Sequence, residues 1–222
     1  MNFKTLRKLT QKKYRREMGL WIIEGEKIVS EHKDKAVAIL TRGENIDEKS
    51  FDAVSSLETS QGVMAVVPVP RGRMEVRGNV LVLDRIQDPG NVGTLLRTAK
   101  AFGFGTVFCI DSADAWSQKV LRSASGVQLG MNIVECGLDE FLAWYAGNGD
   151  LPLITADMGG CDIGEFAPTK CAFGLVLGNE GSGVCAQLKT LAKHVVSVPM
   201  QNGVESLNVA VAGGILMYKL GG

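Results

Sequence analysis

Three absences narrow the class of this 222-residue sequence before any motif is considered. Its 24 Lys and Arg residues balance 24 Asp and Glu residues, so the net charge of zero indicates no particular partner. No apolar run is long enough to span a bilayer, which argues against a membrane protein. No apolar stretch follows the basic N-terminus, as it would in a signal peptide, so we expect a cytoplasmic protein.

Histidine and cysteine are too few and too scattered to predict a metal site. The two histidines, His32 and His194, join no Ser–Asp or metal-binding pattern. The five cysteines form no CxxC pair, and their odd number does not suit a disulfide framework. Cys109, Cys136 and Cys171 stand in apolar runs, so we expect small buried residues in a reducing compartment.

Positive charge is concentrated at the N-terminus. Residues 1–16, "MNFKTLRKLTQKKYRR", contain only basic charges. Such a segment favours a polyanion, with nucleic acid as the obvious candidate, although a solvated first helix has the same composition. The residues that we predict to contact nucleic acid are Lys8, Lys12, Lys13, Arg15 and Arg16.

The chain divides into two parts of different character. We predict a small domain over residues 1–70, a linker over 71–78 and a larger domain over 79–222. In the larger domain, buried-type strands alternate with helical stripes, which predicts a parallel sheet with helices on both faces. The strands are expected at 80–84, 106–111, 131–136, 151–157, 173–178 and 194–200, and the helices at 92–103, 117–126, 138–147, 184–193 and 206–220.

The last predicted helix is apolar on most sides and contains Gly213 and Gly214. Glycine weakens a helix, so both residues indicate a close approach of another backbone. Burial within one subunit and a homodimer interface both satisfy this pattern.

Polar loops follow three of the predicted strands, at 88–93, 178–183 and 200–208. Ligands bind at the carboxyl ends of such strands. The second loop, "GNEGSG", lacks the Lys-Ser or Lys-Thr pair of a P-loop, and its glycines do not follow the GxGxxG order. Glu180 within it would repel a phosphate, so the loop suits a ligand with little negative charge or with a positive charge. A nucleotide-cofactor oxidoreductase is therefore disfavoured.

The sequence resembles a known family in these same segments. "DPGNVGTLLRTAKAFG", "LVLGNEGSGV" and "VPMQNGVESLNVAVAGGILMYKL" resemble the three motifs of the SpoU (TrmH-like) RNA 2′-O-ribose methyltransferases, of the SPOUT class. "GLWIIEGEKIV" and "TSQGVMAVV" are similar to the N-terminal RNA-binding domain of that family. The resemblance implies an α/β methyltransferase domain with a parallel sheet and a trefoil knot, a small N-terminal α/β RNA-binding domain, S-adenosylmethionine as cofactor and a homodimer.

The resemblance also implies roles for particular residues. The catalytic positions are Asn91, Arg97, Glu180, Ser206 and Asn208, and the backbone groups expected to bind the cofactor belong to Leu177, Gly178, Val198 and Leu207. We expect Arg97 to hold a phosphate and stabilise an alkoxide rather than act as a base, because a guanidinium rarely loses its proton.

Structural roles would suit several of these residues equally. Asn91 and Ser206 are good helix N-caps, and Glu180 could complement a helix start capped by Ser182.

Ribosomal RNA is the expected substrate, because the pairing of an N-terminal and a catalytic module is typical of members that modify it. Transfer RNA is the alternative within the family. A non-catalytic RNA-binding protein on the same fold is the alternative from another class.

Overall fold

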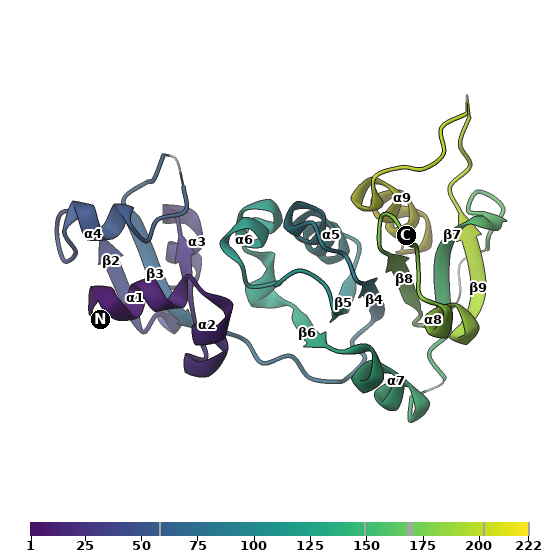
Figure 1. The fold of residues 1–222 in the computed structure, drawn as a ribbon, viewed down its shortest axis with the longest axis horizontal. Coiled ribbons are helices and arrows are strands. Elements are labelled where there is room, and N and C mark those ends of the chain that lie inside the picture. The colour runs from purple at the N-terminus through teal and green to yellow at the C-terminus, as the bar shows by residue number, and fades with distance from the viewer. Residues whose placement is uncertain (58, 149, 168–170, 202, 222) are drawn as a thin grey trace.

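We describe a computed structural model, which covers residues 1–57, 59–148, 150–167, 171–201 and 203–221. It contains two sheets, a three-stranded antiparallel sheet of order β1-β3-β2 and a six-stranded parallel sheet of order β6-β5-β4-β8-β7-β9 (Figure 1).

The N-terminal domain surrounds the antiparallel sheet with short helices. Its elements are α1 (Phe3–Leu9), α2 (Lys12–Met18), β1 (Leu20–Glu24), α3 (Glu26–Glu31), a 3₁₀ turn (Lys33–Lys35), β2 (Ala38–Thr41), α4 (Glu48–Asp52) and β3 (Val63–Pro68). The alternation of side chains along a strand buries both faces of this sheet. Ile22 packs with Leu6 and Phe51 in one core, whereas Trp21 and Ile23 belong to a core shared with the larger domain.

Two tryptophans mark the junction of the two domains. The rings of Trp21 and Trp116 meet edge to face with centroids 5.1 Å apart, and both side chains are buried. Gln118 Nε2 donates a hydrogen bond to the carbonyl oxygen of Ile22 at 2.8 Å. A continuous apolar core therefore fixes the N-terminal domain against the larger domain.

The larger domain has helices on both faces of the parallel sheet, as predicted. Its elements are β4 (Asn79–Asp84), α5 (Pro89–Ala101), β5 (Phe104–Ile110), α6 (Gln118–Ala124), a 3₁₀ turn (Val127–Gly130), β6 (Asn132–Cys136), α7 (Leu138–Ala146), β7 (Leu153–Asp162), β8 (Gly174–Gly178), α8 (Ala186–Leu191), β9 (Ala192–Ser197) and α9 (Val209–Gly221). Helices α5, α6 and α9 cover one face, and α7 and α8 cover the other (Figure 1).

The last strand and last helix are shorter than predicted. Strand β9 ends at Ser197 rather than at residue 200, because Pro199 lacks the N–H that a strand interior needs. Helix α9 begins at Val209 rather than at residue 206. Residues on either side of Pro199 are thereby left in a loop at the carboxyl end of the sheet.

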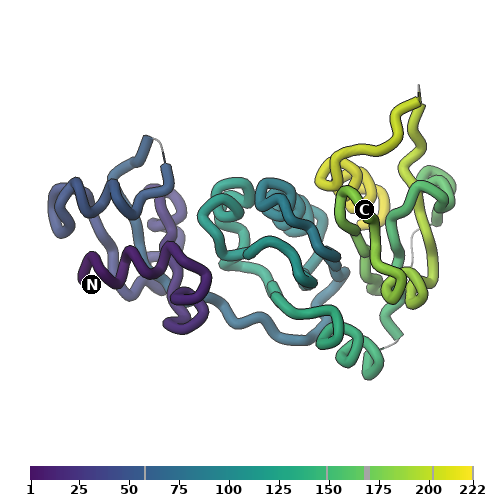
Figure 2. The backbone as a smooth tube through the Cα atoms, viewed as in Figure 1, coloured from purple at the N-terminus to yellow at the C-terminus, as the bar shows by residue number. Residues whose placement is uncertain are grey.

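The connection between the domains, residues 69–78, is bound along its length. Arg73 N donates to Asn132 Oδ1 at 2.8 Å, and Asn132 Nδ2 donates back to Arg73 O at 2.9 Å. Trp144 Nε1 donates to Met74 O at 2.9 Å, and a Cβ at Gly72 would overlap the backbone of Ile133. Figure 2 shows this connection running past β6 toward α7. The predicted linker is therefore a fixed strap, while the domain limits themselves stay a prediction.

Helix α9 explains only one of its two glycines within the subunit. A Cβ at Gly213 would lie 2.5 Å from Leu95 Cδ2 and 2.6 Å from Leu177 Cδ1, so glycine lets α9 pack against α5 and β8. A Cβ at Gly214 would make only ordinary contact, 3.9 Å from Thr98 Cγ2. No helix among the described residues is long and apolar enough to cross a membrane.

The cysteines follow the predicted pattern only in part. Cys109 is buried and Cys136 is half-buried, but Cys171 is exposed, contrary to expectation. Burial raises the pKa of Cys136 to about 12, so its thiol stays protonated at neutral pH.

Candidate active site

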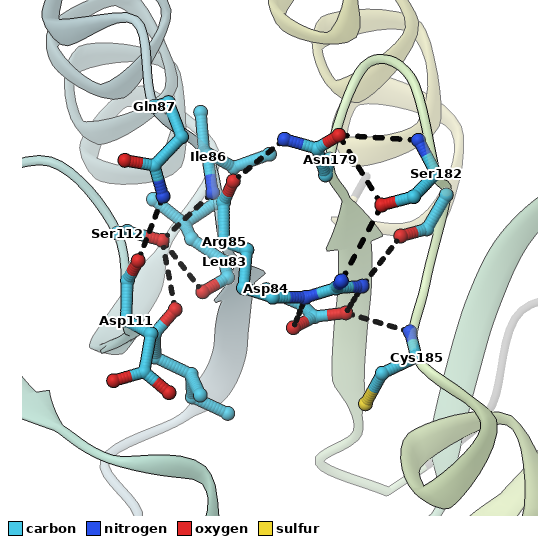
Figure 3. A network of polar contacts seen from close by, with 12 residues as sticks. Leu83, Asp84, Arg85, Ile86, Gln87, Asp111, Ser112, Asn179, Ser182 and Cys185 are labelled. Carbon is cyan, nitrogen blue, oxygen red and sulfur yellow. Dashed lines mark hydrogen bonds and ion pairs between the residues drawn. The ribbon is translucent and has the colours of Figure 1, made fainter.

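The glycine-rich loop after β8 is held in place by a buried ion pair. Arg85 Nε and Nη2 donate to the two carboxylate oxygens of Asp84 at 2.9 and 3.0 Å, and Asp84 is 1 % exposed (Figure 3). The same Nη2 donates to Gly183 O at 3.0 Å, and Cys185 N donates to Asp84 Oδ2 at 2.7 Å. The ion pair raises the pKa of the Arg85 guanidinium. Two residues at the end of β4 thus fix the far end of the loop.

Asn179 fixes the near end of the same loop. Its Nδ2 donates to Arg85 O at 3.0 Å, and its Oδ1 accepts from Gly181 N at 3.0 Å and Ser182 N at 3.1 Å (Figure 3). Ser182 is therefore part of an Asx turn and does not cap α8, contrary to the structural alternative that we considered. Gly178 is required where the loop closes, because a Cβ there would overlap Gly183 and Val184.

Sequence reasoning missed the residues Asp84, Arg85 and Asn179. Arg85 has a left-handed backbone, with φ 58°, which the sequence does not reveal. Asn179 precedes a Gly-containing turn, a signal that could have been used.

A cavity of about 250 Å³ lies at the carboxyl ends of β8 and β9. All four residues predicted to bind the cofactor line it: Leu177, Gly178, Val198 and Leu207. Its walls are largely apolar, and its lining contains no Lys, Arg or His. The carboxylates that line it belong to Asp157 and Glu180, and Lys189 holds the pKa of Asp157 below its usual range. This chemistry fits a ligand with an apolar part and a positive charge, as a sulfonium compound has.

Three predicted catalytic residues meet at the edge of this cavity, one from each polar loop. Asn91 Nδ2 donates to Glu180 Oε1 at 2.8 Å, and Asn208 Nδ2 donates to Asn91 Oδ1 at 3.0 Å. Ser206 also lines the cavity. The loops at 88–93, 178–183 and 200–208 are thus brought together as their positions predicted.

The capping alternatives for Asn91 and Ser206 are wrong. Asp88 is the N-cap of α5 and accepts from Asn91 N at 2.9 Å, so the Asn91 side chain is available to the site. Asn208, rather than Ser206, accepts from the first N–H groups of α9, with Ala210 N at 2.9 Å. Asn208 therefore caps a helix and orients Asn91 with the same amide.

Arg97 lies away from these residues. Six residues beyond Asn91 on α5, it is displaced by about 9 Å along the helix axis and turned to another face. Its exposed guanidinium donates from Nη1 to Ser125 Oγ at 3.1 Å and lines a second cavity, between the two domains. Within one subunit, the structure does not bring Arg97 together with Glu180.

Three of the five predicted nucleic-acid contacts instead bind the larger domain. Arg15 is 4 % exposed and pairs with Asp114, while Lys12 and Arg16 lie 3.4 and 3.2 Å from the carboxylate of Glu135. The two remaining lysines, Lys8 and Lys13, lie over the ring of Tyr14, at 5.0 and 5.8 Å from its centroid. Arg15 cannot contact nucleic acid without leaving its buried ion pair.

Comparisons with known proteins agree with this site. Residues 78–218 match the SpoU rRNA Methylase family. A 23S rRNA (guanosine(2553)-2′-O)-methyltransferase, RlmP of Bacillus subtilis, is 36 % identical, over 99 % of this chain and 95 % of its own length. A 23S rRNA (adenosine(1067)-2′-O)-methyltransferase of Streptomyces laurentii is 32 % identical, over 70 % of this chain and 60 % of its own.

A solved structure extends the similarity to the whole fold. The AdoMet-bound rRNA methyltransferase of Sinorhizobium meliloti superposes with a TM-score of 0.88 at 25 % identity, covering 98 % of this chain and 92 % of its own.

The parallel α/β fold, with its apolar cofactor-sized cavity at the carboxyl ends of the strands, is that of a SPOUT-class methyltransferase. Within that class the chain belongs to the SpoU rRNA methylase family. The predicted fold class, enzyme class and cofactor, S-adenosylmethionine, are thereby confirmed.

Proposed function

We propose that this protein methylates a ribose 2′-hydroxyl of ribosomal RNA, using S-adenosylmethionine. The observation that carries the proposal is the chain of hydrogen bonds from Glu180 through Asn91 to Asn208, beside a cavity whose charged lining is acidic only. When bound, S-adenosylmethionine supplies a methyl group made electrophilic by its sulfonium. The negative charge of Glu180 favours that cation in the cavity.

The residues around the cavity position the reactants. Asn91 is held on both sides of its amide, by Glu180 and by Asn208, so its orientation is fixed before RNA arrives. The cofactor would contact backbone groups of the pinned loop and of Val198 and Leu207. Such pre-set positioning supplies much of the acceleration of a displacement, of order 7–11 kcal/mol in favourable cases.

Arg97 acts on the RNA side of the reaction. Its guanidinium would hold a phosphate next to the target ribose and stabilise the alkoxide that develops as the 2′-oxygen attacks. Its exposed place on α5, outside the cofactor cavity, suits contact with RNA rather than with the cofactor.

Ribosomal RNA is supported over transfer RNA by the relatives. The RlmP-type relative, which this chain matches over nearly its whole length, is named as a 23S rRNA enzyme. Since ribosomal RNA is handled inside the cell, we place the reaction in the cytoplasm.

A second copy of the chain would complete the protein as a homodimer. Helix α9 exposes an apolar stripe of Val211, Ile215 and Tyr218 at helical spacing, with Tyr218 65 % exposed. The stripe lies on the side of α9 away from Gly213 and suits a like helix. Sedimentation of wild type against a Val211→Lys/Tyr218→Lys variant tests this: we expect a dimer and a monomer, and a monomeric wild type would refute it.

The reaction is tested with methyl-labelled S-adenosylmethionine and unmodified ribosomal or transfer RNA, followed by alkaline hydrolysis. A methylated 2′-oxygen cannot attack the neighbouring phosphate, so we expect label in alkali-resistant dinucleotides from ribosomal RNA. Label in mononucleotides would mean base methylation and contradict the proposal. Label from transfer RNA alone would correct the substrate.

A further inference from the structure

The cavity that contains Arg97 lies between the two domains and has a volume of about 720 Å³. Its walls come from the N-terminal domain on one side and from α5 and α6 on the other. We call it the interdomain cleft. It is distinct from the cofactor cavity, with which it shares no lining residue.

Four cations from three helices line the interdomain cleft, and all four are exposed. They are Lys27 of α3, Arg97 and Lys100 of α5, and Arg122 of α6. None of them lies within ion-pair distance of a carboxylate among the described residues. Their charge is therefore available to a ligand.

The contacts that these cations make are with neutral oxygens. Lys100 Nζ donates to Gly130 O at 3.0 Å, and Arg122 Nη1 donates to Ser56 O. Arg97 donates to Ser125 Oγ, as described above. These bonds direct the side chains into the cleft without neutralising them.

The acidic residues of the cleft do not cancel this charge. Glu24 and Glu31 are the carboxylates that line it, against four cations. Glu24 is already bound by its own domain, since it accepts from Ser55 Oγ at 2.5 Å and Ser60 Oγ at 2.7 Å. The excess of positive charge selects an anion with several charges.

The walls of the cleft are fixed relative to each other. Gly126, with φ 77°, faces Ile28 so closely that a Cβ would overlap its side chain. With the hydrogen bond from Gln118 to Ile22, this contact holds α3 beside α6.

We propose that the interdomain cleft binds the phosphates of the RNA strand adjoining the target nucleotide, with Lys27, Lys100 and Arg122 as contacts additional to Arg97. The proposal rests on the function proposed above. Arg97 connects the two sites, because it lies on the helix that begins beside Asn91. The lining contains no Phe, Tyr or Trp to stack on bases, so the cleft contacts the backbone and does not select sequence.

The test compares two double variants. Lys27→Gln/Lys100→Gln removes two cleft charges, and Lys49→Gln/Lys193→Gln removes two exposed lysines that do not line the cleft. Binding of a ribosomal RNA fragment is followed by fluorescence anisotropy from low to high salt. We expect the cleft variant to lose about 1.4 from the slope of log affinity against log salt, about 0.7 for each phosphate contact. The control variant should keep the wild-type slope.

Equal slopes for the two variants would overturn the proposal. The cleft variant should also raise the KM for RNA while leaving the dissociation constant of S-adenosylmethionine, measured by calorimetry, within about twofold of wild type. The slope is a binding measurement, so it decides the role of the cleft even if wild-type protein transferred no methyl group. That last result would refute the proposed reaction alone.

Discussion

Two basic regions of this molecule can be compared, the helices α1 and α2 and the interdomain cleft. The first is conspicuous in the sequence, with its charges in one run, but Lys12, Arg15 and Arg16 bind carboxylates of the larger domain. The second is assembled from residues far apart in the sequence and has no carboxylate partner among the described residues. Charge density along a chain therefore does not measure the charge that a ligand meets.

The largest effect is expected at Arg97, the cleft residue nearest the reaction. Arg97→Ala should lower kcat by about 10³-fold, since one group stabilising a developing oxyanion contributes about 10²–10³. Cofactor affinity, measured by calorimetry, should stay near wild type because Arg97 does not line the cofactor cavity. Arg97→Lys keeps the charge without the planar fork and should recover part of the rate. Wild-type turnover in the alanine variant would remove Arg97 from the mechanism.

Arg15 should respond in stability rather than in catalysis. Arg15→Met leaves Asp114 without its buried partner and should lower the free energy of unfolding by about 3 kcal/mol. Urea unfolding measures this loss, and Asp114→Leu added to the same chain should recover part of it. The salt dependence of RNA binding should not change. A reduced slope at unchanged stability would assign Arg15 to RNA instead.

Gly126 tests whether the walls of the cleft must stay in contact. Gly126→Ala should cost about 2 kcal/mol of stability, because the new Cβ overlaps Ile28 and the backbone is left-handed. Gly103→Ala is the matched control, since Gly103 also has φ 77° but has nothing within 4 Å of its Cβ position. The excess cost at Gly126, read from thermal or urea unfolding, measures the domain contact. Equal costs would show that Ile28 moves aside freely.

The smallest effect separates residues within the N-terminal segment itself. Lys8→Gln/Lys13→Gln should lower the salt slope of RNA binding by about 1.4, because neither lysine has an ion-pair partner among the described residues. Lys12→Gln/Arg16→Gln should change it less, because those charges face Glu135. Anisotropy titrations at several salt concentrations give both slopes. The reverse order would show that RNA displaces Glu135.

The sequence predicted the order of elements well, because buried strands and amphipathic helices alternate clearly from Asn79 onward. It also placed Asn91, Glu180 and Asn208 at one sheet edge, since the carboxyl ends of parallel strands converge. The direct contacts among them were not predictable, because they depend on which residue caps each helix. Asp88 and Asn208 took the capping roles, which left Asn91 and Ser206 for the site.

The partners of the charged residues could not be read from the sequence. Arg15 is separated from Asp114 by 99 positions, and Arg85 from Ser182 by 97. Such pairs follow from tertiary packing, for which local composition carries no signal. The left-handed backbone of Arg85 is equally hidden, because nothing about an arginine indicates a positive φ.

The bound strap at residues 69–78 has a consequence for the thermodynamics of RNA recognition. A flexible linker would let the N-terminal domain sample many orientations, and RNA would have to restrict them at the cost of binding free energy. Here Asn132 and Trp144 hold the strap, and the core around Trp21 holds the domain. The entropy of aligning the two domains is thus lost during folding, so an RNA that spans both domains meets a surface whose spacing is already set.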